Sequence, residues 1–148
     1  MKDSSKIRRV TLNTGSIDHW VLFGIVAAEP DYRLSLALNK KLRINLRSTA
    51  PLIIHDENQA DLTFSKFSCS AEPAGMIFDL ISNKSGKSSL IRKMKNIDYF
   101  FVIHDIHEET EAGTFLKNLR ETDCITAVFK IEPGILKDKN LKYIIHQV

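Results

Sequence analysis

The segment IDYFFVI at residues 97–103 decides how the chain is expected to fold, because both faces of a strand formed there would be apolar except at Asp98. Strands that are covered on both faces carry such continuous apolar runs, whereas half-exposed strands alternate apolar and polar residues. We therefore predict a central strand at 97–103. A lone acid in such a strand needs a partner when it is buried, and Tyr99 or a nearby Arg or Lys is the expected partner of Asp98.

The residues that follow the central strand predict a helix and a second strand. Acidic residues at 108, 109 and 111 suit the positive end of a helix dipole, and apolar residues behind them repeat at helical spacing. From Ile125 to Ile131 every second residue is apolar or small, which is typical of a strand, and Pro133-Gly134 ends it. This strand, helix, strand order resembles half of a ferredoxin-like layer. The apolar triplet 143–145 is expected to pair with a sheet edge.

The residues before the central strand predict a β-hairpin. Its turn is the segment Ala-Glu-Pro-Ala-Gly at 71–75, which has the residue types that turns favour. After the turn, apolar residues alternate from Met76 to Leu80. Before the turn, the apolar positions change phase between residues 62–64 and residues 67–69, and this shift predicts a β-bulge.

The N-terminal part of the chain predicts a pair of helices. Ser16 suits the N-cap of the first helix, apolar residues recur at helical spacing as far as Ala28, and Pro30 ends the pattern. Asp31 opens the second helix, whose leucine-rich face continues to Leu42.

Three shorter segments near this helix pair carry further predictions. Residues 8–13 alternate weakly and predict a short first strand. Residues 1–7 are expected to form a flexible N-terminus. Residues 42–46 alternate Leu and Ile with Arg and Asn, so we expect extended backbone there, until Pro51 breaks any regular continuation.

Together these elements predict an α+β fold: a mainly antiparallel sheet with an N-terminal helix pair and a later strand-helix-strand unit, in a single two-layer domain over residues 1–148. A chain of 148 residues is long enough to bury one core. Its 43% apolar and 26% charged residues are close to those of ordinary globular proteins, so neither disorder nor a fibrous repeat is favoured.

Composition also bounds the compartment. The sequence contains no stretch of about 20 apolar residues, the length that spans a bilayer. The first six residues are not followed by the apolar core of a secretion signal. We expect a cytoplasmic protein with no membrane partner. Cys69 and Cys124 form no CxxC unit, so buried reduced thiols are expected rather than a disulfide or a zinc site.

A basic segment precedes the central strand. It contains no acidic residue, although the whole chain carries a net charge of only +3, and its basic residues are Lys84, Lys87, Arg92, Lys93 and Lys95. Gly86-Lys87-Ser88 copies the end of a nucleotide-binding loop, but that loop also needs a glycine where Ile81 stands, so we predict a surface turn. Nucleic acid is not an expected partner, because no aromatic residues are interleaved for base stacking. A solvated loop and a contact with phosphate or an acidic partner both stay open.

Other chemical patterns give mostly negative results. His104, His107, Glu108 and Glu109 lie together at the end of the central strand, but the histidines lack the i, i+4 spacing of a zinc-binding helix. No nucleophile elbow is present, and neither cysteine has a basic neighbour in a recognisable turn. We therefore name no catalytic residue, no metal ligand and no cofactor. Whether the protein is an enzyme stays open, since catalytic groups can meet in space.

The second predicted helix carries an unusual set of polar side chains. Tyr32, Arg33 and Asn39 accompany its leucine-rich face, and we treat them as candidate binding residues together with Lys87, Arg92 and Lys93. Asp31 at the start of this helix is interpreted as structural, as are Asp98 and Tyr99.

Three ordered segments resemble the small bacterial family named IPExxxVDY after its motif. The first resembling segment is Asp-Tyr-Arg-Leu at 31–34 with Ala-Leu-Asn-Lys at 37–40, and the second is Leu-Ile-Ser-Asn-Lys-Ser at 80–85. The third spans 91–99, where Ile91 aligns with the isoleucine of the motif, Ile97 with its valine, and Asp98-Tyr99 with its final pair. The resemblance implies a small cytoplasmic α+β protein without an assigned activity.

Two positions depart from the family motif. Arg92 stands where the motif has proline, and Lys93 stands where it has glutamate. The backbone at 92 therefore loses a fixed φ angle, and the charge at 93 is reversed. A role tied to that glutamate does not carry over to this chain.

Two functional hypotheses follow. The preferred one is a noncatalytic binding or interaction module that contacts a protein partner or an unidentified small ligand through Tyr32, Arg33, Asn39 and the basic segment. Self-association as a homodimer is part of this hypothesis, because the apolar triplet 143–145 and a bulged edge offer apolar or unpaired surface. The alternative is a small enzyme or an anion- or metal-binding protein that acts at His104, His107 and Glu108.

Overall fold

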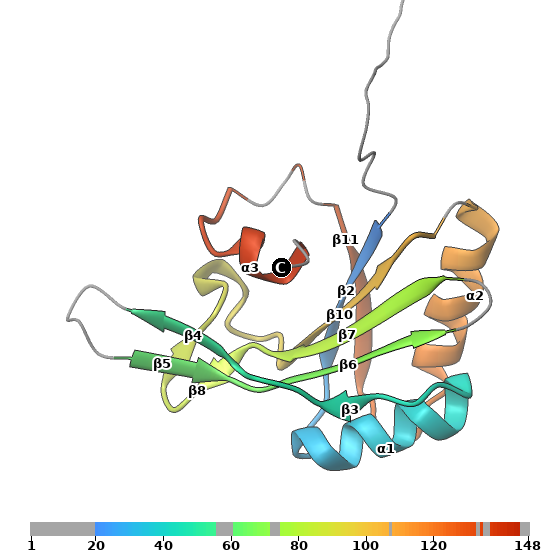
Figure 1. The fold of residues 1–148 in the computed structure, drawn as a ribbon, viewed down its shortest axis with the longest axis horizontal. Helices are drawn as coiled ribbons and strands as arrows, with labels where there is room; N and C mark the ends of the chain where they lie inside the picture. Colours follow the sequence, from blue (N-terminus) through green and yellow to red (C-terminus); the bar gives the residue numbers. More distant parts are fainter. Residues whose placement is uncertain are drawn as a thin grey trace, which may run out of the picture.

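The computed structural model describes residues 20–55, 61–71, 75–106, 108–132, 134 and 137–145. Within them the chain has an α+β fold built on an antiparallel sheet, which confirms the predicted class (Figure 1). The predicted strand at 8–13 and the N-terminus at 1–7 lie outside the described residues.

The main sheet has six strands in the order β11-β2-β10-β7-β6-β3, and all neighbours are antiparallel. Its strands in chain order are β2 (Trp20–Val26), β3 (Arg47–Ser48), β6 (Lys66–Ala71), β7 (Met76–Ser82), β10 (Tyr99–His104) and β11 (Ala127–Ile131). Two small hairpins pair β4 (Leu52–His55) with β5 (Asp61–Phe64), and β8 (Lys84–Ser85) with β9 (Ser88–Ser89). The helices are α1 (Asp31–Leu42), the 3-10 helix η1 (Arg92–Met94), α2 (Glu109–Arg120) and α3 (Leu141–Ile145).

Strand β10 lies inside the sheet between β2 and β7, as its apolar sequence predicted. All six of its residues are buried. The predicted hairpin is also confirmed, because β6 and β7 pair antiparallel with Cys69 opposite Phe78. β10 and β11 are both antiparallel to β2, which lies between them, so they run parallel to each other on either side of it. Together with α2 they form the predicted strand-helix-strand unit.

Each face of the sheet is covered by different elements. Helices α1 and α2 cover one face, where Phe78 stacks on Phe101 with 5.9 Å between ring centroids and meets Phe115 edge-on. The opposite face packs against α3, the β4–β5 hairpin and the segment 83–97, as the shared cluster of Phe100, Ile144 and their neighbours shows. The predicted helical layer is therefore present, and an unpredicted cover of hairpin, loop and short helix lies on the other side (Figure 1).

The helix predicted over residues 16–28 is wrong, because residues 20–26 form strand β2. This strand is flanked by β10 and β11 and its five central residues are buried, so its sequence is apolar on both faces. A continuous apolar run fits helical spacing and strand spacing equally well. Gly24 allows close packing within this strand. A Cβ at that position would lie 2.9 Å from Ile131 Cδ1 and 3.0 Å from Ile97 Cδ1, which is too close. The predicted helix pair is thus one strand followed by one helix.

Two shorter predictions also change. The phase shift between residues 62–64 and 67–69 is not a bulge: Ser65 separates β5 from β6, and these strands belong to different sheets. Residues 44–46 form no strand, because α1 continues to Leu42 and the left-handed Arg43, with φ 57°, turns the chain away. A period alone reveals neither the boundary between two strands at Ser65 nor the left-handed turn at Arg43.

The apolar triplet 143–145 forms the end of helix α3 rather than an edge strand. Ile144 is buried in the core on the side of the sheet opposite α1 and α2. Helix α2 begins at Glu109, among the acidic residues expected at its start, and β11 begins at Ala127 rather than at Ile125. None of the helices in the described residues is long and apolar enough to cross a bilayer.

Candidate functional site

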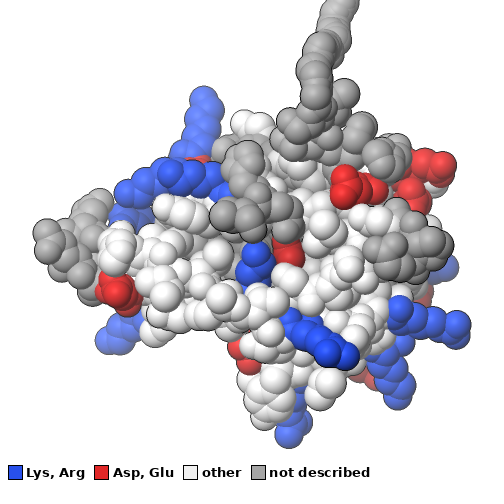
Figure 2. All heavy atoms as spheres, viewed as in Figure 1, with Lys and Arg blue, Asp and Glu red and all other residues white. Residues whose placement is uncertain are grey.

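The basic segment forms one wall of a pocket of about 330 Å³ at one end of the molecule. The β4–β5 hairpin, the β8–β9 hairpin, η1 and the residues before α3 surround it. Its cationic lining residues are Lys87, Arg92, Lys95 and Lys139. No aspartate or glutamate is among the described residues that line it. Figure 2 shows basic side chains around the part of the molecule that α3 and β8 occupy in Figure 1. We call this cavity the basic pocket.

Asn83 shapes the loop that carries two of these cations. Its side chain is fully buried, and its Nδ2 donates to the carbonyl oxygens of Met94 and Ile97, both at 2.8 Å. Its Oδ1 accepts the Ile91 N–H at 2.9 Å. One side chain therefore satisfies three backbone groups around η1. These hydrogen bonds fix the backbone from which the side chains of Arg92 and Lys95 extend.

The segment with the letters of a nucleotide-binding loop is a hairpin turn, as predicted. Ser85 pairs with Ser88, and Gly86 takes a positive φ of 59° at the first central position of the turn. Two-residue hairpins of type II′ need glycine at that place. The turn places Lys87 in the lining of the pocket. It therefore provides the pocket with one positive charge, and not with the series of backbone N–H groups that a nucleotide-binding loop provides.

Hydrogen bonds tie the walls of the basic pocket together. The Thr63 N–H of β5 donates to Ser85 Oγ of β8 at 3.2 Å. Asn140 Nδ2 donates to the Leu90 carbonyl oxygen at 2.8 Å and joins the start of α3 to the same loop. Lys84 Nζ donates to the carbonyl oxygen of Lys95. The cationic side chains therefore extend from segments whose relative positions are fixed by hydrogen bonds.

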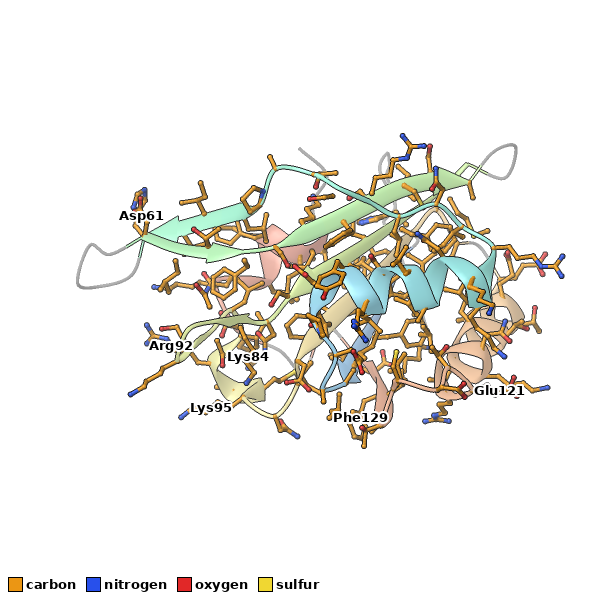
Figure 3. The ribbon with its side chains drawn as sticks, turned by 90° about the horizontal axis from the view of Figure 1, so that it is seen from below. Asp61, Lys84, Arg92, Lys95, Glu121 and Phe129 are labelled. Carbon is orange, nitrogen blue, oxygen red and sulfur yellow. The ribbon has the colours of Figure 1, made fainter. Side chains whose placement is uncertain are left out.

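The other residues that line the pocket are partly polar and partly apolar. The polar groups are His55, Ser88, Ser89 and Asn140, and the apolar residues are Ile54, Leu62 and Phe64. Asp61 is not among the lining residues, and its carboxylate contacts the ring of His55 across the end of the hairpin. Figure 3 shows Asp61, Lys84, Arg92 and Lys95 at the same end of the molecule. The apolar residues all belong to β4 and β5, whereas the cations belong to the facing loops.

The predicted binding residues fall into two groups. Lys87 and Arg92 line the basic pocket, while the exposed Lys93 does not. Lys139 and Asn140 also line it, and sequence reasoning missed them because they lie about 50 residues away along the chain. The mixed polar composition of residues 137–142 gave only a weak signal.

The predicted residues on α1 do not line the basic pocket. Asn39 is structural: its Oδ1 accepts the Leu46 N–H at 2.7 Å, and its Nδ2 donates to the Leu46 carbonyl oxygen at 3.2 Å. Arg33 lies 4.0 Å from the Glu29 carboxylate on the surface. The side chain of Tyr32 is exposed, and its backbone N–H donates to Asp31 Oδ1 at 2.7 Å.

Asp98 and Tyr99 fasten the start of β10 to the chain that leaves β2. Asp98 Oδ2 accepts the Ala27 N–H at 3.0 Å, so its partner is backbone rather than the predicted Tyr, Arg or Lys. The Tyr99 hydroxyl donates to the Glu29 carbonyl oxygen at 2.6 Å. Burial, followed by the nearby carboxylates of Asp31 and Asp98, raises the pKa of Tyr99 to about 12. Tyr99 therefore stays a neutral donor.

Replacing Asp98 with alanine is expected to destabilise the protein by about 1–3 kcal/mol, because the buried Ala27 N–H loses its acceptor. Urea unfolding followed by circular dichroism measures this loss. Asp98→Asn is the matched control, since an amide oxygen still accepts that hydrogen bond, and we expect it to retain most of the stability. An alanine variant as stable as the parent protein would contradict this assignment.

A buried polar cluster that sequence reasoning missed crosses three strands. Asp79 of β7 is 1% exposed, accepts a hydrogen bond from Ser68 Oγ of β6, and lies 3.1 Å from His104 Nε2 of β10. Burial alone would raise the pKa of the Asp79 carboxyl, but the hydrogen bonds from His104 and Ser68 and the charge of Lys66 outweigh it and lower that pKa. The ionised carboxylate only accepts, so Nε2 of His104 carries a proton.

This cluster bears on the alternative hypothesis about the end of the central strand. His104 is buried and paired with Asp79, whereas Glu108 is exposed and accepts a weak hydrogen bond from Thr110 at 3.4 Å. His107 lies outside the described residues. Across the described parts of the chain, no group of three or more His, Cys, Asp or Glu side chains is placed to hold a metal ion.

Neither a scan against protein-family models nor a search of the curated proteins found a match for this chain.

Proposed function

We propose that the protein is a noncatalytic binding module that holds a small anionic group in the basic pocket. The observation that carries this proposal is the meeting of four cationic side chains around a concave space whose described lining residues include no aspartate or glutamate. Three of the cations come from the basic segment, and the fourth, Lys139, comes from the residues before α3. Cations gathered around a cleft attract and retain anions more strongly than the same charges spread over a surface.

The ion pairing of the lining lysines supports the proposal. Within the described residues, the ammonium groups of Lys87, Lys95 and Lys139 form no ion pair with a carboxylate. Three positive charges thus line one pocket, and its described lining residues include no carboxylate. Their mutual repulsion favours an anion from solution, because an opposite charge within a few ångströms relieves it.

We also propose that the chain belongs to the IPExxxVDY family, with the motif region serving as the wall of the binding site. Ile91 and Ile97 of that region are buried, and Asp98 and Tyr99 fix its end through backbone contacts. Arg92, which replaces the proline of the motif, supplies a cation to the pocket. A cytoplasmic location is part of the same proposal.

Self-association keeps only part of the support that the sequence offered for it. In the triplet 143–145, Ile144 is 1% exposed whereas Tyr143 is 38% exposed, and the expected bulge is a junction between two strands. We therefore place binding at the basic pocket and leave a homodimer out of the proposal.

Titration with inorganic phosphate, followed by amide chemical shifts, tests this function. We expect shifts in residues 84–95 and 139–140, and about fivefold weaker binding in Lys95→Gln, because one of four attracting charges is gone. Lys93→Gln is the matched control: it removes the same charge from the same turn, but its side chain does not line the pocket. Equal losses in both variants, or no saturable shift in the parent protein, would refute the proposal.

A further inference from the structure

We infer that the ligand of the basic pocket is a phosphate monoester of a small organic molecule with a single ring, rather than free inorganic phosphate or a polyanion. This inference rests on the proposed function and adds the chemical class of the ligand. The feature behind it is the division of the pocket into a cationic side and an apolar side.

The two sides come from different elements. Ile54 and Leu62 are opposite each other in the β4–β5 pair, and both side chains are half-buried and line the pocket. Lys87, Arg92 and Lys95 come from the basic segment, so charged and apolar side chains line one pocket from different elements. Figure 3 shows Arg92 and Lys95 on the segment below the β4–β5 hairpin, which carries Asp61. A ligand that satisfies both walls must itself carry an anionic end and an apolar end.

The anionic end is best matched by phosphate. A phosphate monoester carries a charge of about −1.5 to −2 at pH 7 and three strong acceptor oxygens, whereas a carboxylate carries one charge on two oxygens. The described lining offers four cations, together with the hydroxyl groups of Ser88 and Ser89 as further donors. This supply of donors exceeds what one carboxylate accepts and suits a dianion.

The volume limits the apolar end. An apolar cavity of about 150 Å³ binds benzene. A pocket of about 330 Å³ therefore holds one ring together with one phosphate group, and lies at the small end of the range for ligand sites. Binding of a nucleic acid strand would use aromatic stacking platforms, but Phe64, the aromatic residue in the lining, is 1% exposed.

Calorimetric titrations of the full chain with phenyl phosphate, inorganic phosphate, phenol and a short oligonucleotide test the inference. We expect phenyl phosphate to bind about tenfold more tightly than inorganic phosphate, since the ring buries apolar surface in addition. Phenol alone is expected to bind more weakly than phenyl phosphate by at least the same factor.

Two variants separate the apolar contribution from the charge. Ile54→Thr is expected to weaken phenyl phosphate about threefold while inorganic phosphate is unchanged. Ile53→Thr is the matched control, because Ile53 is the neighbouring residue of β4, is 58% exposed and does not line the pocket. Thermal unfolding of both variants verifies that the hairpin region is folded.

The outcomes distinguish the inference from the proposed function. Equal affinities for phenyl phosphate and inorganic phosphate would overturn the inference and leave anion binding intact. Tighter binding of the oligonucleotide than of phenyl phosphate would also overturn it, in favour of a polyanion. Equal binding of phenol and phenyl phosphate, or no binding of any anion, would overturn the proposed function as well.

Discussion

Replacing Asn83 with alanine is expected to lower the free energy of unfolding by about 3 kcal/mol and to abolish measurable phosphate binding. The large effect follows from the position of this side chain, which is 0% exposed and bonds three backbone groups of the loop 91–97. Each buried backbone group that loses its partner costs about 1–3 kcal/mol, and partial relaxation of the loop recovers some of the total. The relaxed loop then no longer holds Arg92 and Lys95 in place.

Urea unfolding and the phosphate titration measure the two effects of Asn83→Ala on one preparation. Asn39→Ala provides the matched control, because Asn39 also bonds backbone groups through both ends of its amide, at Leu46, but lies outside the basic pocket. We expect Asn39→Ala to lose stability of about 1–2 kcal/mol and to keep its phosphate affinity. An Asn83→Ala protein that binds phosphate as the parent does would show that the loop does not depend on this side chain.

Asn83 also illustrates what the sequence can predict about the site. The density of lysine and arginine between residues 84 and 95 is visible in the sequence, and Lys87, Arg92 and Lys95 of this segment line the basic pocket. The partners of Asn83 and the position of Lys139 depend on how segments pack, since Asn140 reaches Leu90 across a separation of 50 residues. Tertiary contacts of this kind leave no periodic trace in a single sequence.

The fold, like the site, could be predicted from the sequence only in part. The apolar run of β10 predicted a strand buried on both faces, because strands covered on both faces carry such continuous apolar runs and the short length of the run at 97–103 favours a strand over a helix. The equally apolar run of β2 was assigned to a helix, because Trp20, Val21 and Ile25 also recur at helical spacing. Only the strands on both sides of β2 decide between the two structures.

Buried polar residues are the hardest features to predict, and Asp79 is the clearest case. Its neighbours in the sequence, Phe78 and Leu80, suggest an ordinary half-buried strand with an exposed acid. In the sheet, Ser68 lies opposite Asp79 on one side, and the strand that carries His104 lies on the other. The donors that make burial of the acid tolerable thus come from two other strands, in line with the rule that buried charges need partners.

Replacing Asp79 with alanine is expected to destabilise the protein by about 3–5 kcal/mol at pH 7, because the buried Nε2–H of His104 and the hydroxyl of Ser68 lose their acceptor, each at a cost of about 1–3 kcal/mol. Ser68→Ala is the control. It removes one donor while the pair with His104 stays, so we expect a loss of about 1 kcal/mol. Urea unfolding of the parent and both variants measures these differences.

The pH dependence gives an independent test of Asp79. Its pKa is lower in the folded protein than the ordinary value of 3.8, so the ionised carboxylate stabilises the fold. That stabilisation is fully present above pH 3.8 and is lost as the pH falls through the lower folded value. The stability difference between the parent and Asp79→Asn should therefore shrink below pH 3.8, with Lys66 and His104 as the other titratable groups beside the carboxyl. A difference that instead grows on acidification would mean that Asp79 is buried in its neutral form, and that the cluster is held by a shared proton rather than by charge.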